Sequence, residues 1–275
     1  MSTMSDRPDF LPFVTKVIGN KINCFPSYRS LYDFILKDLN EKQQRGYITV
    51  NNVHTMMEGY RDPQFKRFIE ESYLSIPDGK PLQIVGKLKN ATGISRLFGP
   101  TILEKFLDWG RKDKTRHFLF GGTVETLKAM QEKILARYPG TDIVGAISPP
   151  FGAISSWPND IFVREINESK ADMIWVGLGA PKQEAWMHQF SGQIDKGILF
   201  GIGAGFSYIA GTTKHAPNWM KNASLEWLFR LGQEPKRLFK RYLVTIPPFI
   251  FLAAADVLSY KIGRRREQLI GRRKA

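Results

Sequence analysis

Short runs of β-branched and apolar residues alternate with amphipathic stretches over the first 200 residues of the chain. In the stretch 27–44, apolar residues recur every three or four positions, which places them on one face of a helix. Helices of this kind separate runs that we expect to be strands, at 46–50, 72–76, 117–120, 142–146, 172–178 and 197–202. Strands joined through helices lie parallel, so the alternation predicts an α/β fold, a Rossmann-like, mostly parallel sheet with helices on both faces.

The helices between these strands carry recognisable start signals. Asp62 and Pro63 are typical of an N-cap and a first helical residue, and they predict a helix that ends near residue 71. Another helix is expected to start at residue 80 or 81, and a strand with a turn at 16–24. The remaining expected helices span 27–44, 101–110, 123–138, 159–170 and 182–190.

After residue 211 the pattern changes to helices only. We expect one helix over 217–229, an interruption at Pro235, and a second helix from there to residue 244. An apolar segment follows at 245–260, opened by Pro247 and Pro248 and interrupted by Asp256. These changes divide the chain into an α/β domain (1–211), a helical appendage (212–244), and an apolar helix with a basic tail (245–275).

Most of the net charge of +14 lies near the end of the chain. Residues 214–275 hold 14 basic and four acidic side chains, a net charge of +10. Such a localised field attracts phosphates, whether of nucleic acid, an anionic bilayer or a diphosphate substrate. The apolar segment is shorter than the ~20 residues of a membrane span. We therefore expect the appendage to associate with an anionic membrane surface, the alternative being a core helix with a solvated tail.

Several classes of protein are disfavoured by residues that the chain lacks. Its single cysteine, Cys24, excludes an intramolecular disulfide framework and a cysteine-only zinc site. The four histidines show no metal-ligand spacing, and no Asp-x-Asp element follows a strand, so no metal is expected. The first ten residues are polar and do not resemble a secretory leader.

Two glycine-rich loops follow expected strands, at 177–181 and 201–205. Each places backbone without side chains, including Gly179 and Gly203, at the carboxyl end of a strand, where open α/β sheets bind ligands. Neither loop matches the Gly-x-Gly-x-x-Gly fingerprint with an acidic residue ~20 positions later. A nicotinamide cofactor is therefore disfavoured, and no cofactor is expected.

Asp78 lies in a strand-to-helix turn, between Pro77 and Gly79. A carboxylate at that edge of the sheet could serve as a general base, although capping of the following helix is the commoner use of Asp in such a turn. Arg96 and Gln183 present the same choice between a ligand contact and an ordinary surface position.

Together these residues resemble a known family. The matching segments are Thr49–Asn51 with His54, 76–79, Arg96, Gly121-Gly122, 172–184 with its Gly-Ala-Pro-Lys-Gln-Glu run, 201–211, Ala216-Pro217, 225–230 (Leu-Glu-Trp-Leu-Phe-Arg) and 234–237. They occur in order between about residues 18 and 242, and they resemble the WecG/TagA/CpsF glycosyltransferases.

The resemblance implies that a sugar moves from a UDP-sugar to a polyprenyl-diphosphate-linked acceptor, with inversion and without an essential metal. It implies a peripheral enzyme at the cytoplasmic face of the inner (plasma) membrane that acts in cell-surface polysaccharide biosynthesis. The transferred group would be a hexose, or an N-acetylhexosamine or its uronic acid. Nucleic acid is not expected as a partner, and a homo-oligomer is compatible with the sequence.

The resemblance also implies roles for individual residues. The family's general base falls on Asp78, and its active-site arginine and glutamine fall on Arg96 and Gln183. The resemblance implies substrate-binding positions at Thr49, Asn51, Arg230, Arg237 and Lys240, to which the glycine loops described above add Gly179 and Gly203. Two positions depart from the family pattern: Val50 replaces a proline, and Lys240 replaces an arginine, which keeps the charge but loses bidentate phosphate geometry.

Two other classes of function remain as alternatives. One is a Rossmann-like nucleotide-sugar-binding or NAD-dependent enzyme, which the missing fingerprint disfavours. The other is a non-catalytic module that binds polyanions through its basic tail. Such a module has no reason to gather Asp78, Arg96 and Gln183 in one pocket, so their placement separates these classes.

Overall fold

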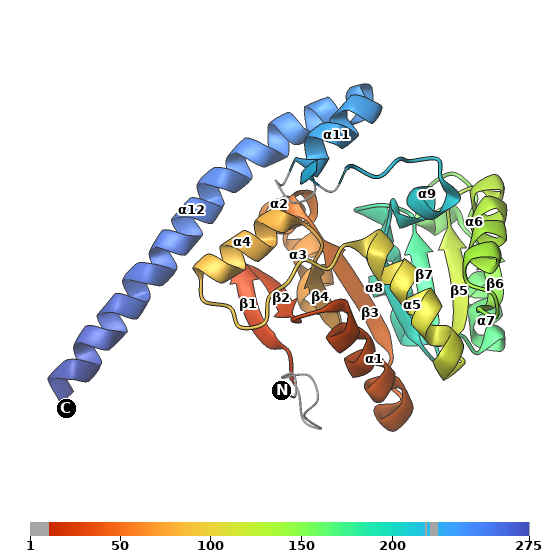
Figure 1. Cartoon of the computed structure of the whole chain (residues 1–275), viewed down its shortest axis with the longest axis horizontal. Helices are drawn as coiled ribbons and strands as arrows, with labels where there is room; N and C mark the ends of the chain where they lie inside the picture. Colours follow the sequence, from red (N-terminus) through yellow and green to blue (C-terminus); the bar gives the residue numbers. More distant parts are fainter. Residues whose placement is uncertain (1–10, 218, 221–224, 275) are drawn as a thin grey trace.

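A computed structural model describes residues 11–217, 219–220 and 225–274 of the chain. Its centre is a six-stranded sheet in the order β4-β3-β8-β7-β5-β6, in which every neighbouring pair is parallel (Figure 1). The strands are β3 (Gly46–Asn51), β4 (Leu74–Pro77), β5 (Arg116–Gly121), β6 (Asp142–Ile147), β7 (Met173–Gly177) and β8 (Ile198–Gly201). The predicted parallel α/β fold is confirmed.

Helices cover both faces of the sheet. The described helices are α1 (Tyr28–Lys42), α2 (Val53–Arg61), α3 (Pro63–Glu70), α4 (Lys80–Leu88), α5 (Gly99–Asp113), α6 (Val124–Arg137), α7 (Asn159–Ser169), α8 (Lys182–Phe190), α9 (Gly205–Ala210), α11 (Glu226–Gln233) and α12 (Pro235–Lys274), with short 3₁₀ turns η2 (Ile154–Ser156) and η3 (Ser191–Gln193). Helices α1, α5, α6 and α9 pack on one face, and α7 and α8 pack on the other.

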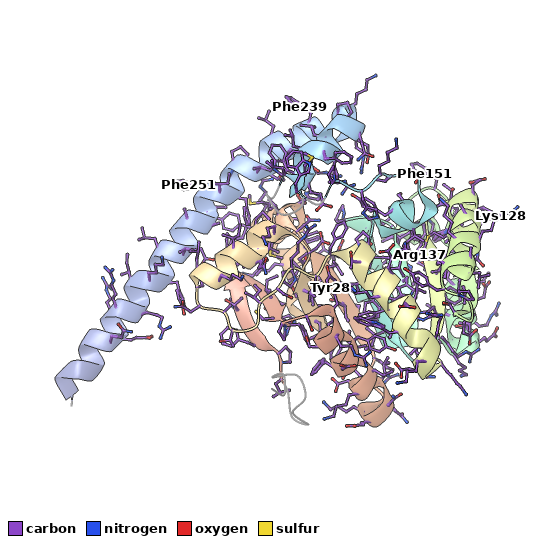
Figure 2. The ribbon with its side chains drawn as sticks, in the orientation of Figure 1. Tyr28, Lys128, Arg137, Phe151, Phe239 and Phe251 are labelled. Carbon is purple, nitrogen blue, oxygen red and sulfur yellow. The ribbon has the colours of Figure 1, made fainter. Side chains whose placement is uncertain are left out.

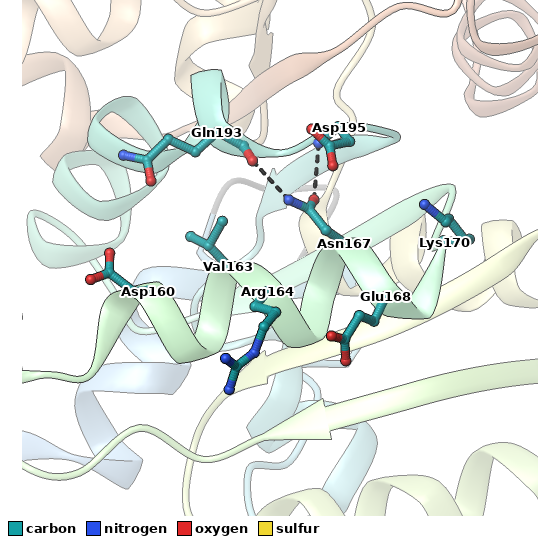
Figure 3. Close-up of a pocket in the computed structure, with 8 residues that line it drawn as sticks. All are labelled: Asp160, Val163, Arg164, Asn167, Glu168, Lys170, Gln193 and Asp195. Carbon is teal, nitrogen blue, oxygen red and sulfur yellow. Dashed lines mark hydrogen bonds between the residues drawn. The ribbon is translucent and has the colours of Figure 1, made fainter.

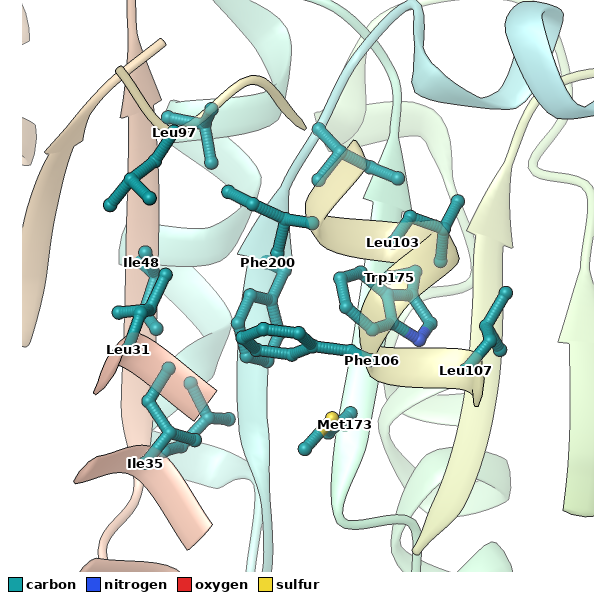
Figure 4. Packing of buried hydrophobic residues seen from close by; sticks show 14 of the residues in the cluster. Leu31, Ile35, Ile48, Leu97, Leu103, Phe106, Leu107, Met173, Trp175 and Phe200 are labelled. Carbon is teal, nitrogen blue, oxygen red and sulfur yellow. The ribbon is translucent and has the colours of Figure 1, made fainter. Parts of the chain in front are cut away.

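Alternating side chains of the strands divide the core into two layers. Trp175 and Phe200 point to the α5 side and contact each other and Phe106, with ring centroids 4.5–6.1 Å apart (Figure 4). Their neighbours in sequence, such as Val176 and Leu199, point to the α8 side. Both faces are therefore apolar, as the near-continuous hydrophobic strands of a buried parallel sheet require.

Local signals explain where several helices begin. The Asp62 carboxylate accepts the backbone N–H of Gln64 at 2.8 Å, so the predicted N-cap is confirmed. Helices α2 and α9 were not expected from the sequence. Helix α2 starts directly after β3, where the Asn52 side chain accepts the backbone N–H of His54 at 2.9 Å and caps it.

A small hairpin lies beside the main sheet. Strands β1 (Phe13–Val17) and β2 (Asn20–Cys24) pair antiparallel, and the turn between them has positive φ at Ile18 and Gly19. The hairpin packs with α2, α3 and α4 around a third apolar cluster. Two residues of α12, Phe249 and Ala253, complete this cluster and dock the long helix onto it.

The last helix differs from the sequence prediction. An end at residue 244 and a separate helix opened by Pro247-Pro248 were expected, but α12 runs unbroken from Pro235 to Lys274 (Figure 1). Pro248 cannot donate to the carbonyl of Val244, four residues earlier. Instead the Arg61 guanidinium of α2 donates to that carbonyl at 2.7 Å. The predicted interruption at Pro235 is confirmed, since Glu234 is non-helical and Pro235 starts α12.

Asp256 anchors α12 rather than interrupting it. Its carboxylate accepts the backbone N–H of Ile18 at 3.0 Å and the Lys89 ammonium at 2.8 Å. The Lys89 ammonium also donates to the carbonyl of Lys16. The one charge within the apolar segment is therefore neutralised by the body of the protein. Of the helix expected over 217–229, residues 218 and 221–224 lie outside the described residues, and α11 begins only at Glu226.

Candidate active site

The carboxyl ends of the parallel strands meet at one edge of the sheet, and the candidate residues lie at that edge. Asp78 follows β4, Asn51 ends β3, Gly203 follows β8, and Gly179 and Gln183 follow β7. Because β4, β3, β8 and β7 are consecutive neighbours, these loops form one continuous rim. This is the edge at which open α/β sheets bind their ligands.

Asp78 is tied into this rim by backbone and side chain. Its N–H donates to the carbonyl of Asn51 at 2.7 Å, and its Oδ1 accepts the N–H of Gly99, the first residue of α5, at 2.7 Å. The N-cap of α4 is Gly79, which has no side-chain cap, so capping of the following helix does not explain Asp78. Burial raises the pKa of its carboxyl to about 6, although Arg96 and the Gly99 N–H oppose this shift.

Arg96 lies directly beside Asp78. Its Nε donates to the backbone carbonyl of Asp78 at 2.8 Å, and its Nη2 forms an ion pair with the Glu226 carboxylate of α11. Both side chains of the ion pair are largely buried, with exposed fractions of 17% and 14%. Arg96 therefore joins the loop that carries Asp78 to the appendage.

Gln183 connects two neighbouring glycine loops. Its Oε1 accepts the N–H of Gly203 at 2.7 Å, and its Nε2 donates to Glu184 at 3.1 Å. A Cβ on Gly203 would lie 3.7 Å from the Cα of Gly179, so the two loops touch. Both glycines have positive φ, and nothing lies within 4 Å of a Cβ placed on Gly179. The pair leaves a side-chain-free surface that a ligand can approach.

Asp78 and Gln183 lie on opposite sides of the strand ends. Gly99 lies between them: a Cβ placed on it would be 3.7 Å from Asp78 Oδ1 and 3.8 Å from the Cβ of Ile202. The residue after Ile202 is Gly203, whose N–H donates to Gln183. Gly99 and the turn of Ile202 and Gly203 therefore lie near each other between the carboxylate on the α5 side and the amide on the α8 side.

Thr49 and Asn51 lie beneath the rim and are fully buried. The Asn51 amide donates to Thr49 Oγ1 and to Ser75 Oγ, both at 2.9 Å, while its own Oδ1 has no partner. Thr49 pairs in register with Gly201, which places it on the α8 face near Gln183. The two residues form a buried polar layer that supports the rim, and their contact with substrate stays a prediction.

The three predicted cations of the appendage occupy different environments. Arg230 is half-buried, its Cζ lies 5.8 Å from the ring centre of Tyr208, and its charge acts to lower the pKa of Asp78. Arg237 is exposed and pairs with Glu234, and Lys240 is exposed. The structure thus brings Arg230 to the site of Asp78 but not Arg237 or Lys240.

Two residues between the rim and the appendage, Tyr208 of α9 and Glu226 of α11, were not predicted as site residues from the sequence. The Tyr208 hydroxyl is buried without a partner, as are Glu226 Oε1 and Arg230 Nε. Tyr208 interacts electrostatically with Asp78, Arg230 and Glu226, and Glu226 also with Asp78. Among the described residues, three buried polar atoms of this group are thus left without a partner, which calls for an explanation such as a polar ligand. Glu226 could have been noticed within its Leu-Glu-Trp motif, whereas Tyr208 carries no local signal.

A cavity of about 650 Å³ lies elsewhere. It follows α7 to η3, the turn that leads into the amino end of β8, and none of the predicted residues lines it (Figure 3). The Asn167 side chain at its centre is already bonded to the backbone of Gln193 and Asp195. Among the described residues, no group of three or more His, Cys, Asp or Glu side chains is placed to hold a metal ion.

A parallel α/β sheet whose strand ends carry a carboxylate, an arginine and two glycine loops has the features of a ligand-binding edge. The family model described as "Glycosyl transferase WecG/TagA/CpsF family" matches residues 15–266, and the chain belongs to this family of glycosyltransferases.

Three curated relatives of the chain share one name. The N-acetylglucosaminyldiphosphoundecaprenol N-acetyl-beta-D-mannosaminyltransferase of Bacillus subtilis (strain 168) is 28% identical over 235 residues, which cover 86% of this chain and 89% of the relative. The protein of that name from Bacillus spizizenii is 25% identical over 76% of this chain and 79% of its own length. That from Staphylococcus aureus (strain MW2) is 29% identical over 58% and 60%.

Proposed function

We propose that this chain is an inverting glycosyltransferase that moves a hexose, an N-acetylhexosamine or its uronic acid from a UDP-sugar to a polyprenyl-diphosphate-linked sugar. The observation that carries this proposal is the Asp78 carboxyl at the ligand-binding edge, with Arg96 bonded to its backbone carbonyl and Arg230 close enough to lower its pKa. The names of the relatives support the acceptor class, since they specify transfer to N-acetylglucosaminyl-diphosphoundecaprenol. The reaction belongs to the biosynthesis of cell-surface polysaccharides.

In the proposed reaction, the Asp78 carboxylate takes the proton of the acceptor hydroxyl as its oxygen attacks the anomeric carbon of the donor. The bond from that carbon to the diphosphate breaks on the opposite side, which inverts the configuration and releases UDP. A carboxyl with a pKa of about 6 is a stronger base than an ordinary Asp and is still ionised at neutral pH. Its environment therefore suits the task.

The leaving diphosphate needs positive charge around it. Arg230 is the cation of the appendage that lies nearest to this chemistry, and we propose that it neutralises the diphosphate as charge develops there. The adjoining glycine loops at Gly179 and Gly203 would admit the diphosphate close to the backbone. Arg237 and Lys240 extend the same positive field from the exposed side of α12 and would guide the donor toward the site.

We further propose that α12 holds the enzyme at the cytoplasmic face of the membrane. The part of α12 from Pro235 to Gln268 is, among the described residues, the one helix long and apolar enough to cross a bilayer. Its outward face carries exposed apolar side chains, including Phe239 and Phe251, which project away from the body (Figure 2). Exposed cations flank them at 236–240 and 261–266. This combination suits an anionic interface.

The contacts of α12 favour a position in the plane of the interface over a crossing. The body binds α12 from Val244, through Asp256, to Tyr260, whose ring lies 5.8 Å from the Lys89 ammonium. These 17 residues extend over about 25 Å at 1.5 Å per residue. A crossing would draw α2 and the hairpin, with their charged side chains, into hydrocarbon, which is costly.

The test is a transfer assay with purified full-length protein. A panel of UDP-sugars is offered with a short-chain prenyl-diphosphate N-acetylglucosamine, and the product is read by mass. We expect one UDP-sugar to add one residue to the acceptor, and D78N to abolish most of this transfer. Absence of product with every UDP-sugar, in the presence of anionic vesicles, would reject the proposal.

A further inference from the structure

Glu184 is a buried acid that the proposed reaction does not use. It follows Gln183 in the first turn of α8, on the side that faces the sheet, and it is fully buried. Its Oε1 accepts a hydrogen bond from Gln183, its Oε2 has no partner, and no ion pair of Glu184 occurs within the described part of the chain. A carboxyl group in such a place is expensive, because burial without full hydrogen bonding costs free energy.

Glu184 shares α8 with buried apolar residues. Trp186 and Met187 of the same helix belong to the apolar layer beneath α8, and Met187 also lies against Gly201. Burial raises the pKa of the Glu184 carboxyl to about 7, which reflects the same cost. Its position in the first turn of α8, where a carboxylate interacts favourably with the helix N-terminus, offsets part of this cost.

The hydrogen bond to Gln183 gives the Glu184 carboxylate a specific role. A glutamine amide has two ends of nearly equal size, and only its partners decide which end points where. The Gly203 N–H requires an acceptor and so selects the oxygen of Gln183. Glu184 Oε1 requires a donor and so selects the nitrogen. With both partners in place the amide has one orientation.

The glycines around the Gln183 amide support the same role. A Cβ on Gly201 would lie 2.6 Å from Gln183 Nε2, too close for any side chain. The amide of Gln183 therefore occupies the space that the missing side chain of Gly201 leaves free. From that position it accepts the Gly203 N–H and holds Gly203 beside Gly179. The orientation of one amide therefore determines the shape of the glycine surface at the rim.

We propose that Glu184 is a positioning residue, which fixes the amide of Gln183 so that this amide holds the Gly203 loop in the shape that receives the donor. The role rests on the proposed function, since it concerns the site of the same reaction. Glu184 itself touches no substrate and acts only through its neighbour.

The experiment compares E184Q, E184M, Q183A and the double variant Q183A/E184M, with exposed Glu165→Gln on α7 as the control. E184Q keeps an acceptor for Gln183, so its kcat should stay within about threefold of wild type. E184M removes the acceptor, and its kcat should fall about tenfold or more, the scale of a lost hydrogen bond. Because both residues act through one amide, Q183A/E184M should be no slower than Q183A alone.

Hydrogen exchange of the peptide that contains Gly203 supplies a readout independent of activity. We expect faster exchange there in E184M and Q183A, and wild-type exchange in E184Q and E165Q. If E184M does not fold, E184D replaces it, because its shorter side chain cannot reach Gln183. Wild-type kcat and exchange in the variant without the acceptor, or multiplied losses in the double variant, would overturn the proposal. If wild type transfers no sugar, the proposed function fails, and the exchange result still decides whether Glu184 holds the loop.

Discussion

Replacement of Asp78 by Asn separates a catalytic carboxylate from a structural one. The pKa of the Asp78 carboxyl rises from 3.8 to about 6 on folding, mainly through burial. At 1.36 kcal/mol per pKa unit, this shift corresponds to about 3 kcal/mol. Below pH 3.8 the group is protonated in both the folded and the unfolded chain. Above pH 6 it is ionised in both, and there it lowers the free energy of unfolding by that amount.

D78N removes this ionisation while keeping an oxygen that can accept the Gly99 N–H. We therefore expect the variant to be more stable than wild type at pH 8, with a Tm higher by up to about 6 °C. The gain should develop between pH 4 and 6 and vanish at lower pH. Turnover should fall on the order of 10²–10⁴-fold, because the acceptor proton has no base to go to.

The assay combines thermal melts from pH 3.5 to 8 with initial rates of sugar transfer. D195N, an exposed aspartate next to η3, is the matched control and should change neither. A donor titration checks that D78N still binds UDP-sugar. A D78N protein that is less stable than wild type at pH 8 and transfers sugar at the wild-type rate would refute the reasoning, and would leave Asp78 as a tie between β4 and α5.

Further predictions concern the appendage. Truncation after Leu231 should abolish transfer while the α/β domain keeps a cooperative melt, and full turnover by the truncated protein would refute a role for α12. R230A should lower kcat at least tenfold more than K240A, since only Arg230 lies at the site of Asp78; equal losses would argue for a general field. E226Q should move the acidic limb of the pH–rate profile to lower pH, because the charge of Glu226 raises the pKa of Asp78; an unmoved limb would contradict this. Sedimentation with anionic vesicles should weaken as salt rises from 50 to about 500 mM, whereas salt-independent attachment would assign binding to apolar contacts alone.

The sheet could be predicted because its strands are locally marked. Each is an apolar run, and the helices between them carry a 3.6-residue pattern with caps such as Asp62. That all strand ends share one edge follows from parallel connection, so Asp78 and Gln183 could be expected at the same rim. The short helices α2, of nine residues, and α9, of six, were not predicted, because an element of one or two turns gives only a brief periodic signal.

Features that depend on distant contacts could not be predicted. A Pro-Pro pair disfavours a continuous helix, and only the approach of Arg61 from α2 supplies the missing donor. From the sequence, Asp256 was predicted to interrupt the apolar segment. Its partners, the Ile18 N–H of the hairpin and the Lys89 ammonium, come from distant parts of the chain. The burial of Thr49 likewise depends on α8, more than 130 residues away.

The bond between Arg61 and the Val244 carbonyl makes the continuity of α12 a property of the whole molecule. Away from the body, that carbonyl would lose its donor, and the Pro-Pro pair would become a flexible joint between the basic start of α12 and its apolar middle. The two halves of α12 therefore move as one rigid helix only while Arg61 of α2 is bonded to the Val244 carbonyl. With α12 on a membrane as proposed, a force on its apolar half reaches α11, and through the ion pair of Glu226 and Arg96 it reaches Asp78, without any change within the sheet.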